Sequence, residues 1–102
     1  MATLYISEFT STSVDHGRGG SAAYQPASFE QTITPIDGTP RQSSAFNAVT
    51  RMVRLHTDAI CSIKFGTNPT AATTNARMAA GQTEYFQVPE TGTYKVSVIA
   101  NT

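Results

Sequence analysis

Two histidines and several aspartates are the residues of this sequence that could support hydrolysis. A nucleophilic mechanism needs a nucleophile, a histidine base and an acid that orients the histidine. The histidines are His16 and His56, and Asp15, Asp37 and Asp58 are the acids that could orient them. No serine stands in a Gly-x-Ser-x-Gly turn, the usual setting of an exposed nucleophile. We interpret His56 as a half-exposed strand residue beside a turn acid, and expect no catalytic activity to depend on either histidine.

Metal and thiol chemistry have equally little support. His16 and His56 lie far apart in the chain and make no local chelate, although Asp15 and His16 could contribute to a site between subunits. Cys61 is the single cysteine, which excludes an internal disulfide and a multi-cysteine zinc site. We expect Cys61 to be buried as a small hydrophobic residue rather than to act as a reactive thiol. No cofactor and no metal are predicted.

Sugar and phosphate chemistry also lack the residue patterns that they require. Glu84 and Glu90 could be read as a glycosidase pair, but they have the character of surface residues, and the sequence has no tryptophan to serve as a sugar platform. The glycines of residues 16–20 resemble a phosphate-binding loop, which needs a strand before it and a helix after it. No helix is predicted there. The sequence therefore favours binding or assembly over catalysis, and we expect the protein not to be an enzyme.

Strands are the elements that must position these residues. Apolar and polar residues alternate with period two in most of the chain, and turn residues separate the runs. Seven or eight short strands predict an all-β fold, an antiparallel β-sandwich or jelly-roll-like domain. One domain, residues 1–102, fits a chain of this length. The predicted strands are residues 3–9, 30–36, 42–48 (centred on Phe46), 50–57, 59–65, 83–88 and 93–100.

Several local features follow from these runs. Thr57 and Asp58 form a gap short enough for a tight hairpin between the strands on either side. Val49 is expected on the same strand face as Val53 and Leu55. Residues 70–80 predict an extended loop from which Met78 reaches the core. The residues expected to be mostly buried are Leu4, Ile6, Ile33, Phe46, Val53, Leu55, Val96 and Val98.

A long aperiodic segment interrupts the pattern at about residues 10–29. It is rich in Ser, Gly and Ala and exceeds the usual loop length, which predicts a flexible arm or long loop. Large residues near its end would either fold back onto the core of their own domain or anchor the arm on a partner, because aromatic side chains are enriched at interface hot spots. We predict that this arm orders on a neighbouring copy or another subunit. The candidate interface residues are His16, Arg18, Tyr24 and Phe29.

The charge content limits the partners. Only 14% of the residues are charged, and seven basic residues balance seven acidic ones. Lys64 and Lys95 stand alone in the sequence, and no basic cluster is visible, so nucleic acid is not an expected partner. No apolar run approaches the roughly 20 residues of a membrane-spanning helix. Residues 1–8 lack a cationic region followed by an apolar one, so neither a membrane partner nor a secretory signal is expected.

The second half of the chain resembles small virion proteins of tailed bacteriophages. The resemblance covers roughly residues 42–102 and is carried by residues 53–71, 77–86 and 94–99. It implies a structural protein made in the bacterial host cytoplasm and incorporated into the phage particle. Among such proteins the sequence is most similar to a capsid decoration or cement protein, which lies on the shell and bridges neighbouring subunits. The implied partners are the major capsid protein and further copies of the chain, and a trimer would fit a local symmetry axis.

Two other classes of function are open at this point. One is a carbohydrate- or receptor-binding module of a phage fibre or spike, which would show an exposed cluster of aromatic and acidic residues. The other is a small hydrolase, which would place His16 or His56 beside a nucleophile in a pocket.

Overall fold

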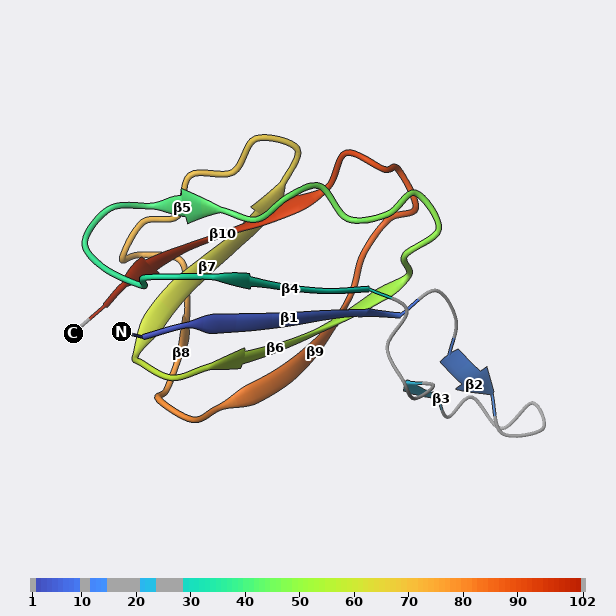
Figure 1. Cartoon of the computed structure of the whole chain (residues 1–102), viewed down its shortest axis with the longest axis horizontal. Coiled ribbons are helices and arrows are strands. Elements are labelled where there is room, and N and C mark those ends of the chain that lie inside the picture. Colours follow the sequence, from blue (N-terminus) through green and yellow to red (C-terminus); the bar gives the residue numbers. More distant parts are fainter. Residues whose placement is uncertain (1, 10–11, 15–20, 24–28, 102) are drawn as a thin grey trace.

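The alternating runs form ten short strands in the computed structural model, which describes residues 2–9, 12–14, 21–23 and 29–101 (Figure 1). No helix occurs among these residues. The strands are β1 (Leu4–Phe9), β2 (Thr12–Val14), β3 (Ser21–Ala23), β4 (Phe29–Ile33), β5 (Arg41–Gln42), β6 (Met52–Thr57), β7 (Cys61–Gly66), β8 (Ala76–Met78), β9 (Thr83–Gln87) and β10 (Lys95–Ala100).

Eight of these strands form two antiparallel sheets of four. The first sheet has the order β4-β1-β6-β9, and the second has the order β5-β10-β7-β8. Figure 1 shows the two sheets as layers, with β1 and β10 in the middle region of their sheets. The predicted all-β class and the antiparallel sandwich are confirmed.

The predicted hairpin at Thr57 and Asp58 is wrong. β6 pairs with β1 and β9, whereas β7 pairs with β10 and β8, so the short connection carries the chain from the first sheet to the second. The hydroxyl of Thr57 donates to the carbonyl of Ala59 at 2.7 Å and fixes this crossing. Both flanking strands have one apolar face, and a crossing lets these faces meet across one core, which a hairpin within a single sheet would not.

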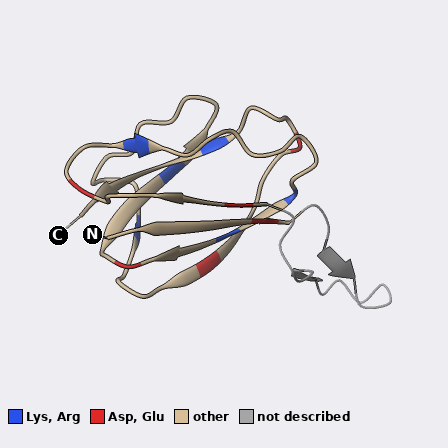
Figure 2. Cartoon of the chain, viewed as in Figure 1, with Lys and Arg blue, Asp and Glu red and all other residues tan. Residues whose placement is uncertain are grey.

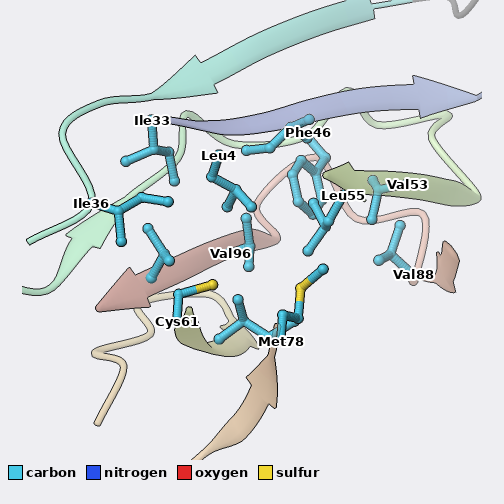
Figure 3. Packing of buried hydrophobic residues seen from close by; sticks show 13 residues of the cluster. Leu4, Ile33, Ile36, Phe46, Val53, Leu55, Cys61, Met78, Val88 and Val96 are labelled. Carbon is cyan, nitrogen blue, oxygen red and sulfur yellow. The ribbon is translucent and has the colours of Figure 1, made fainter. Parts of the chain in front are cut away.

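The core lies between the sheets and contains every residue expected there. Leu4, Val53, Leu55 and Val96 are fully buried, and the other four expected residues are no more than 5% exposed. Figure 3 shows Leu4 and Leu55 of the first sheet facing Val96 and Met78 of the second. The period-two pattern therefore identified the inward face of each central strand.

The region around Phe46 differs from the prediction. Phe46 is buried, but residues 43–47 form no regular strand. The amides of Ser43 and Phe46 donate to the carbonyls of Val96 and Tyr94 at 2.8 Å, so the segment follows β10 irregularly. Val49 does not join the core face either. It is 51% exposed because it lies in a turn, where the Oδ1 of Asn47 accepts its amide hydrogen bond.

The segment expected to be an extended loop is partly a strand. Residues 67–75, which we call the covering loop, lead into the short edge strand β8. Met78 closes β8 and is fully buried, which confirms that this segment reaches the core.

The long segment predicted as an arm contains β2 and β3. These strands pair with each other in antiparallel register, with Ser13 opposite Ala22, and belong to neither four-stranded sheet. Residues 10–11, 15–20 and 24–28 of the predicted arm lie outside the described residues. The role of this segment in assembly stays a prediction.

Candidate interaction face

His56 lies on the outer face of the first sheet and is partly exposed. Its Nδ1 is 2.7 Å from the hydroxyl of Thr83 on the neighbouring strand β9, and its ring centroid is 6.2 Å from that of Tyr5 on β1. No hydrogen bond between His56 and an acid occurs among the described residues, so the orienting group of a triad is missing there. His16 and Asp15 lie outside the described residues.

The two glutamates considered as a glycosidase pair, Glu84 and Glu90, lie in different structural settings. Glu90 follows β9 and forms an exposed ion pair with Arg51, whose Nε lies 2.9 Å from the carboxylate of Glu90. Glu84 lies within β9, opposite Leu55 of β6. In the part of the chain that the structure describes, no three His, Cys, Asp or Glu side chains come together as a metal site would require.

Cys61 is part of the core. Its side chain is fully buried, and Figure 3 shows its sulfur directed between the sheets. Burial raises the pKa of the Cys61 thiol, an effect that the nearby Thr57 hydroxyl, 3.5 Å from the sulfur, partly opposes. A raised pKa keeps the thiol protonated and therefore weakly nucleophilic. The interpretation of Cys61 as a small buried residue is confirmed.

The outer face of the second sheet is covered by the chain itself. Ser97 on the central strand β10 is fully buried beneath the covering loop. The amide of Ala71 in this loop donates to the Ser97 hydroxyl at 2.9 Å. Ser62 on β7 is fully buried as well, and the side chain of Asn101 links it to the carbonyl of Thr73. The covering loop is therefore fixed to two neighbouring strands and closes the middle of this face.

The outer face of the first sheet is buried at one end, at Ser7, Phe9 and Met52, but among the described residues no loop like the covering loop crosses its middle. Residues directly opposite each other in neighbouring strands share a face. Tyr5, His56 and Thr83 form one row across β1, β6 and β9, and Ser7, Arg54 and Tyr85 form the next. Tyr5 is 43% exposed and Tyr85 is 51% exposed.

We call Tyr5, Arg54, His56 and Tyr85 together the aromatic face. The ring of Tyr85 has a fixed neighbour, because its centroid lies 6.5 Å from that of Phe9, which is almost completely buried. Exposed tyrosines on a rigid sheet offer large contact area at a small cost in side-chain entropy. This arrangement is suited to binding a partner surface.

The two sheets also differ in charge. The strands of the second sheet carry four cations and no acid, whereas those of the first carry Glu8, Glu30 and Glu84 with a single cation, Arg54. Figure 2 shows this uneven distribution. Lys64 is opposite Ser97 in the sheet and is therefore a diagonal neighbour of Lys95, at about 7–8 Å. The two lysines are separate along the sequence, and strand pairing brings them to neighbouring positions on the second sheet.

Of the four predicted interface residues, the structure describes one. Phe29 begins β4, is 43% exposed and lines a shallow hollow of about 230 Å³ with Glu8, Glu30 and Asn47. His16, Arg18 and Tyr24 lie outside the described residues, so their predicted contacts are not tested.

The two tyrosines of the aromatic face were missed by the sequence analysis. Tyr5 stands between Leu4 and Ile6, so its outward direction follows from the alternation that predicted this strand. Tyr85 is adjacent to Phe86, and two neighbouring aromatic residues conceal which one faces the core. The pairing of β6 with both β1 and β9, which brings the two tyrosines to one face, has no signal in the sequence.

Within the described ranges, no helix has the length and apolar character needed to cross a membrane. Comparisons with known protein families, with curated proteins and with solved structures found no match to this chain.

Proposed function

We propose that this protein is a structural protein of a tailed-phage particle that decorates the capsid and bridges neighbouring shell subunits. The resemblance of residues 42–102 to small phage virion proteins supports this function. A rigid sandwich with one open face also suits a role that depends on contact rather than catalysis. Many weakly held copies, each touching several subunits, would stabilise a shell by multivalency.

The aromatic face is the surface that we assign to the capsid contact. The observation that carries this choice is the difference between the two outer faces, since the covering loop occupies one and the other presents Tyr5 and Tyr85. Tyrosine and arginine are enriched at interface hot spots, and Arg54 lies opposite Tyr85. The low charge content of the chain limits the desolvation that docking requires.

Particles of the phage that encodes the chain provide the test. Mass spectrometry of purified particles should detect the chain at a fixed ratio to the major capsid protein. A chain that is absent from purified particles would contradict the proposed function. The double variant Tyr5→Ala/Tyr85→Ala should remain folded and bind particles that lack the chain at least ten-fold more weakly than wild type. Val49→Ala is the matched control, because Val49 is equally exposed but lies outside the aromatic face.

Carbohydrate binding is the second candidate, and the same face favours it. The Cα atoms of Tyr5 and Tyr85 lie two strands and two residues apart, roughly 12 Å by standard sheet spacing. Arg54 and His56 of β6 stand between the strands that carry Tyr5 and Tyr85, so polar groups lie between the two rings. Aromatic rings with intervening polar groups could bind consecutive sugar units of a surface polysaccharide.

A glycan array and particle binding separate the two candidates. Binding of a bacterial surface glycan that is lost in Arg54→Ala, with no binding to particles, would favour the carbohydrate function. Particle binding without any glycan signal supports the capsid function.

A further inference from the structure

The edges of the two sheets meet along one side of the sandwich, where β4 and residues 41–47 lie next to each other. Gln31 of β4 connects them: the amide of Ser44 donates to its Oε1 at 2.9 Å, and its Nε2 lies 3.3 Å from the carbonyl of Ser44. A side-chain amide thus makes the two hydrogen bonds that a peptide group of an adjacent strand would make.

The position of Ser44 explains why this bond matters. The amides of Ser43 and Phe46 donate to β10, whereas those of Ser44 and Asn47 point toward the first sheet. Asn47 donates to the carboxylate of Glu8, which is 3% exposed and also accepts from Thr50. The contacts of Glu8 are buried or partly buried, and they include a 3.3 Å hydrogen bond from the Nε2 of Gln31, whereas both contacts between Gln31 and Ser44 are exposed and open to exchange.

Two hollows flank this exposed contact. One, of about 230 Å³, contains Phe29 and Ala45 in its lining, and the other, of about 260 Å³, is bordered by Thr32, Thr34 and Gln42. Gln31 and Ser44 line both, so the hollows form one groove that the Gln31 side chain divides. The edge strand β5 beside this groove has only two residues, which leaves the second sheet without a full edge strand.

We infer that this groove receives an extended strand from the β2–β3 ribbon of a second copy of the chain. The incoming strand would displace the Gln31 side chain, pair with Ser44 and complete the edge of the second sheet. This inference goes beyond the proposed function and does not depend on which particle or ligand the protein serves.

The ribbon is the occupant that the structure favours. It has only two strands of three residues each and pairs with neither large sheet. A two-stranded ribbon of this kind is marginal without further packing, so it needs a partner surface. Its sequence, Thr-Ser-Val and Ser-Ala-Ala, consists of small residues that suit a narrow and largely polar groove.

Cysteine cross-linking between two different single-cysteine chains tests the inference. In a Cys61→Ala background, a Ser44→Cys chain is mixed with a Ser13→Cys or Ala22→Cys chain under mild oxidation. A mixed disulfide dimer should form with at least one ribbon partner. The control is a Gln87→Cys chain with the same partners, because Gln87 is exposed on the opposite edge strand β9. Mixed dimers no more frequent than in the control would overturn the inference.

Self-association gives the second measurement. Gln31→Ala removes the group that competes for Ser44, so the dissociation constant of the copy–copy contact should fall several-fold in sedimentation equilibrium. Gln87→Ala should leave it unchanged. A ribbon variant, Ser13→Pro, should weaken association, because proline cannot donate to a strand ladder. Association that is insensitive to both Gln31→Ala and Ser13→Pro would also overturn the inference. All measurements use the purified chain, so a failure here is distinct from a failure to bind particles.

Discussion

The outer faces of the two sheets are built from similar strands but are completed in different ways. On the second sheet, the fully buried Ser97 and Ser62 hold the covering loop through hydrogen bonds to its backbone or by way of Asn101. On the first sheet, the equivalent central position is Ser7, whose hydroxyl has only a 3.4 Å contact with the exposed Glu30. A buried serine on the outer face therefore holds a loop in one sheet and makes a single long contact with an exposed carboxylate in the other.

This difference indicates where the protein can be changed without unfolding it. The second sheet uses both of its faces for its own stability, since one faces the core and the other holds the loop. The first sheet uses its inner face for the core and leaves Tyr5 and Tyr85 exposed. We expect substitutions on the second sheet to affect the free energy of unfolding, and substitutions on the aromatic face to affect binding.

Met78→Ala should give the largest effect on stability. Met78 is fully buried at the edge of the second sheet, and its truncation leaves a cavity that costs about 2–5 kcal/mol. Tyr85→Ala, at the edge of the first sheet, should cost below about 1 kcal/mol because the ring is half exposed. Denaturant unfolding monitored by circular dichroism measures both. Equal losses in the two variants would contradict the assignment of the aromatic face to binding.

Two serines at matching positions provide a sharper comparison. Ser97→Ala leaves the amide of Ala71, a 2% exposed residue, without its acceptor, which should destabilise the fold by about 1–3 kcal/mol. Ser7 is buried too, but Ser7→Ala leaves only the exposed Glu30 without this partner, so the loss should be smaller, about 0.5 kcal/mol. Hydrogen exchange should show faster exchange of the Ala71 amide in Ser97→Ala alone. A covering loop that stays fully protected in this variant would mean that packing, and not Ser97, holds it.

The core residues could be predicted from the sequence, but the composition of the two outer sheet faces could not. Alternation predicted the inward residues because burial on one side is a local property of a strand. The change of sheet after Thr57 depends on which strands pair, and residues such as Val49 depend on a turn that begins at Asn47. Burial of Ser97 depends on a loop that begins some thirty residues earlier in the chain. Pairing and loop cover are long-range properties, so the aromatic face could be recognised only after folding.

The contribution of Cys61 to the free energy of unfolding should depend on pH, because its thiol is buried in the core beside the second sheet. Its pKa is raised in the folded state, so the unfolded chain loses the thiol proton first as the pH increases. The stabilisation is complete below the unfolded pKa of about 8.5 and is lost as the pH rises through the folded pKa. The difference in unfolding free energy between wild type and Cys61→Ala should therefore shrink from pH 7 to pH 10. Reaction with a maleimide in the native state should be slow, and rapid labelling would show that the core opens at β7.

The smallest effect is expected at Asp37 and Arg41, beside the edge where the groove lies. The Arg41 guanidinium donates to Asp37 at 3.0 Å and lowers the pKa of that carboxyl, assisted by the amide of Thr39 at 3.0 Å. A lowered folded pKa stabilises the protein above the unfolded pKa, and this contribution disappears as the pH falls through the folded value. Asp37→Asn should therefore lower the melting temperature slightly at pH 7 and not at pH 2. Because the pair is exposed, solvent and salt weaken the effect, and 0.5 M NaCl should reduce it further.

Arg41→Gln is the matched control: in that background Asp37→Asn should have less effect at pH 7, retaining only the part due to Thr39. If Asp37→Asn lowers the melting temperature equally in both backgrounds, Asp37 stabilises the protein through the turn at Thr39 and not through the ion pair with Arg41.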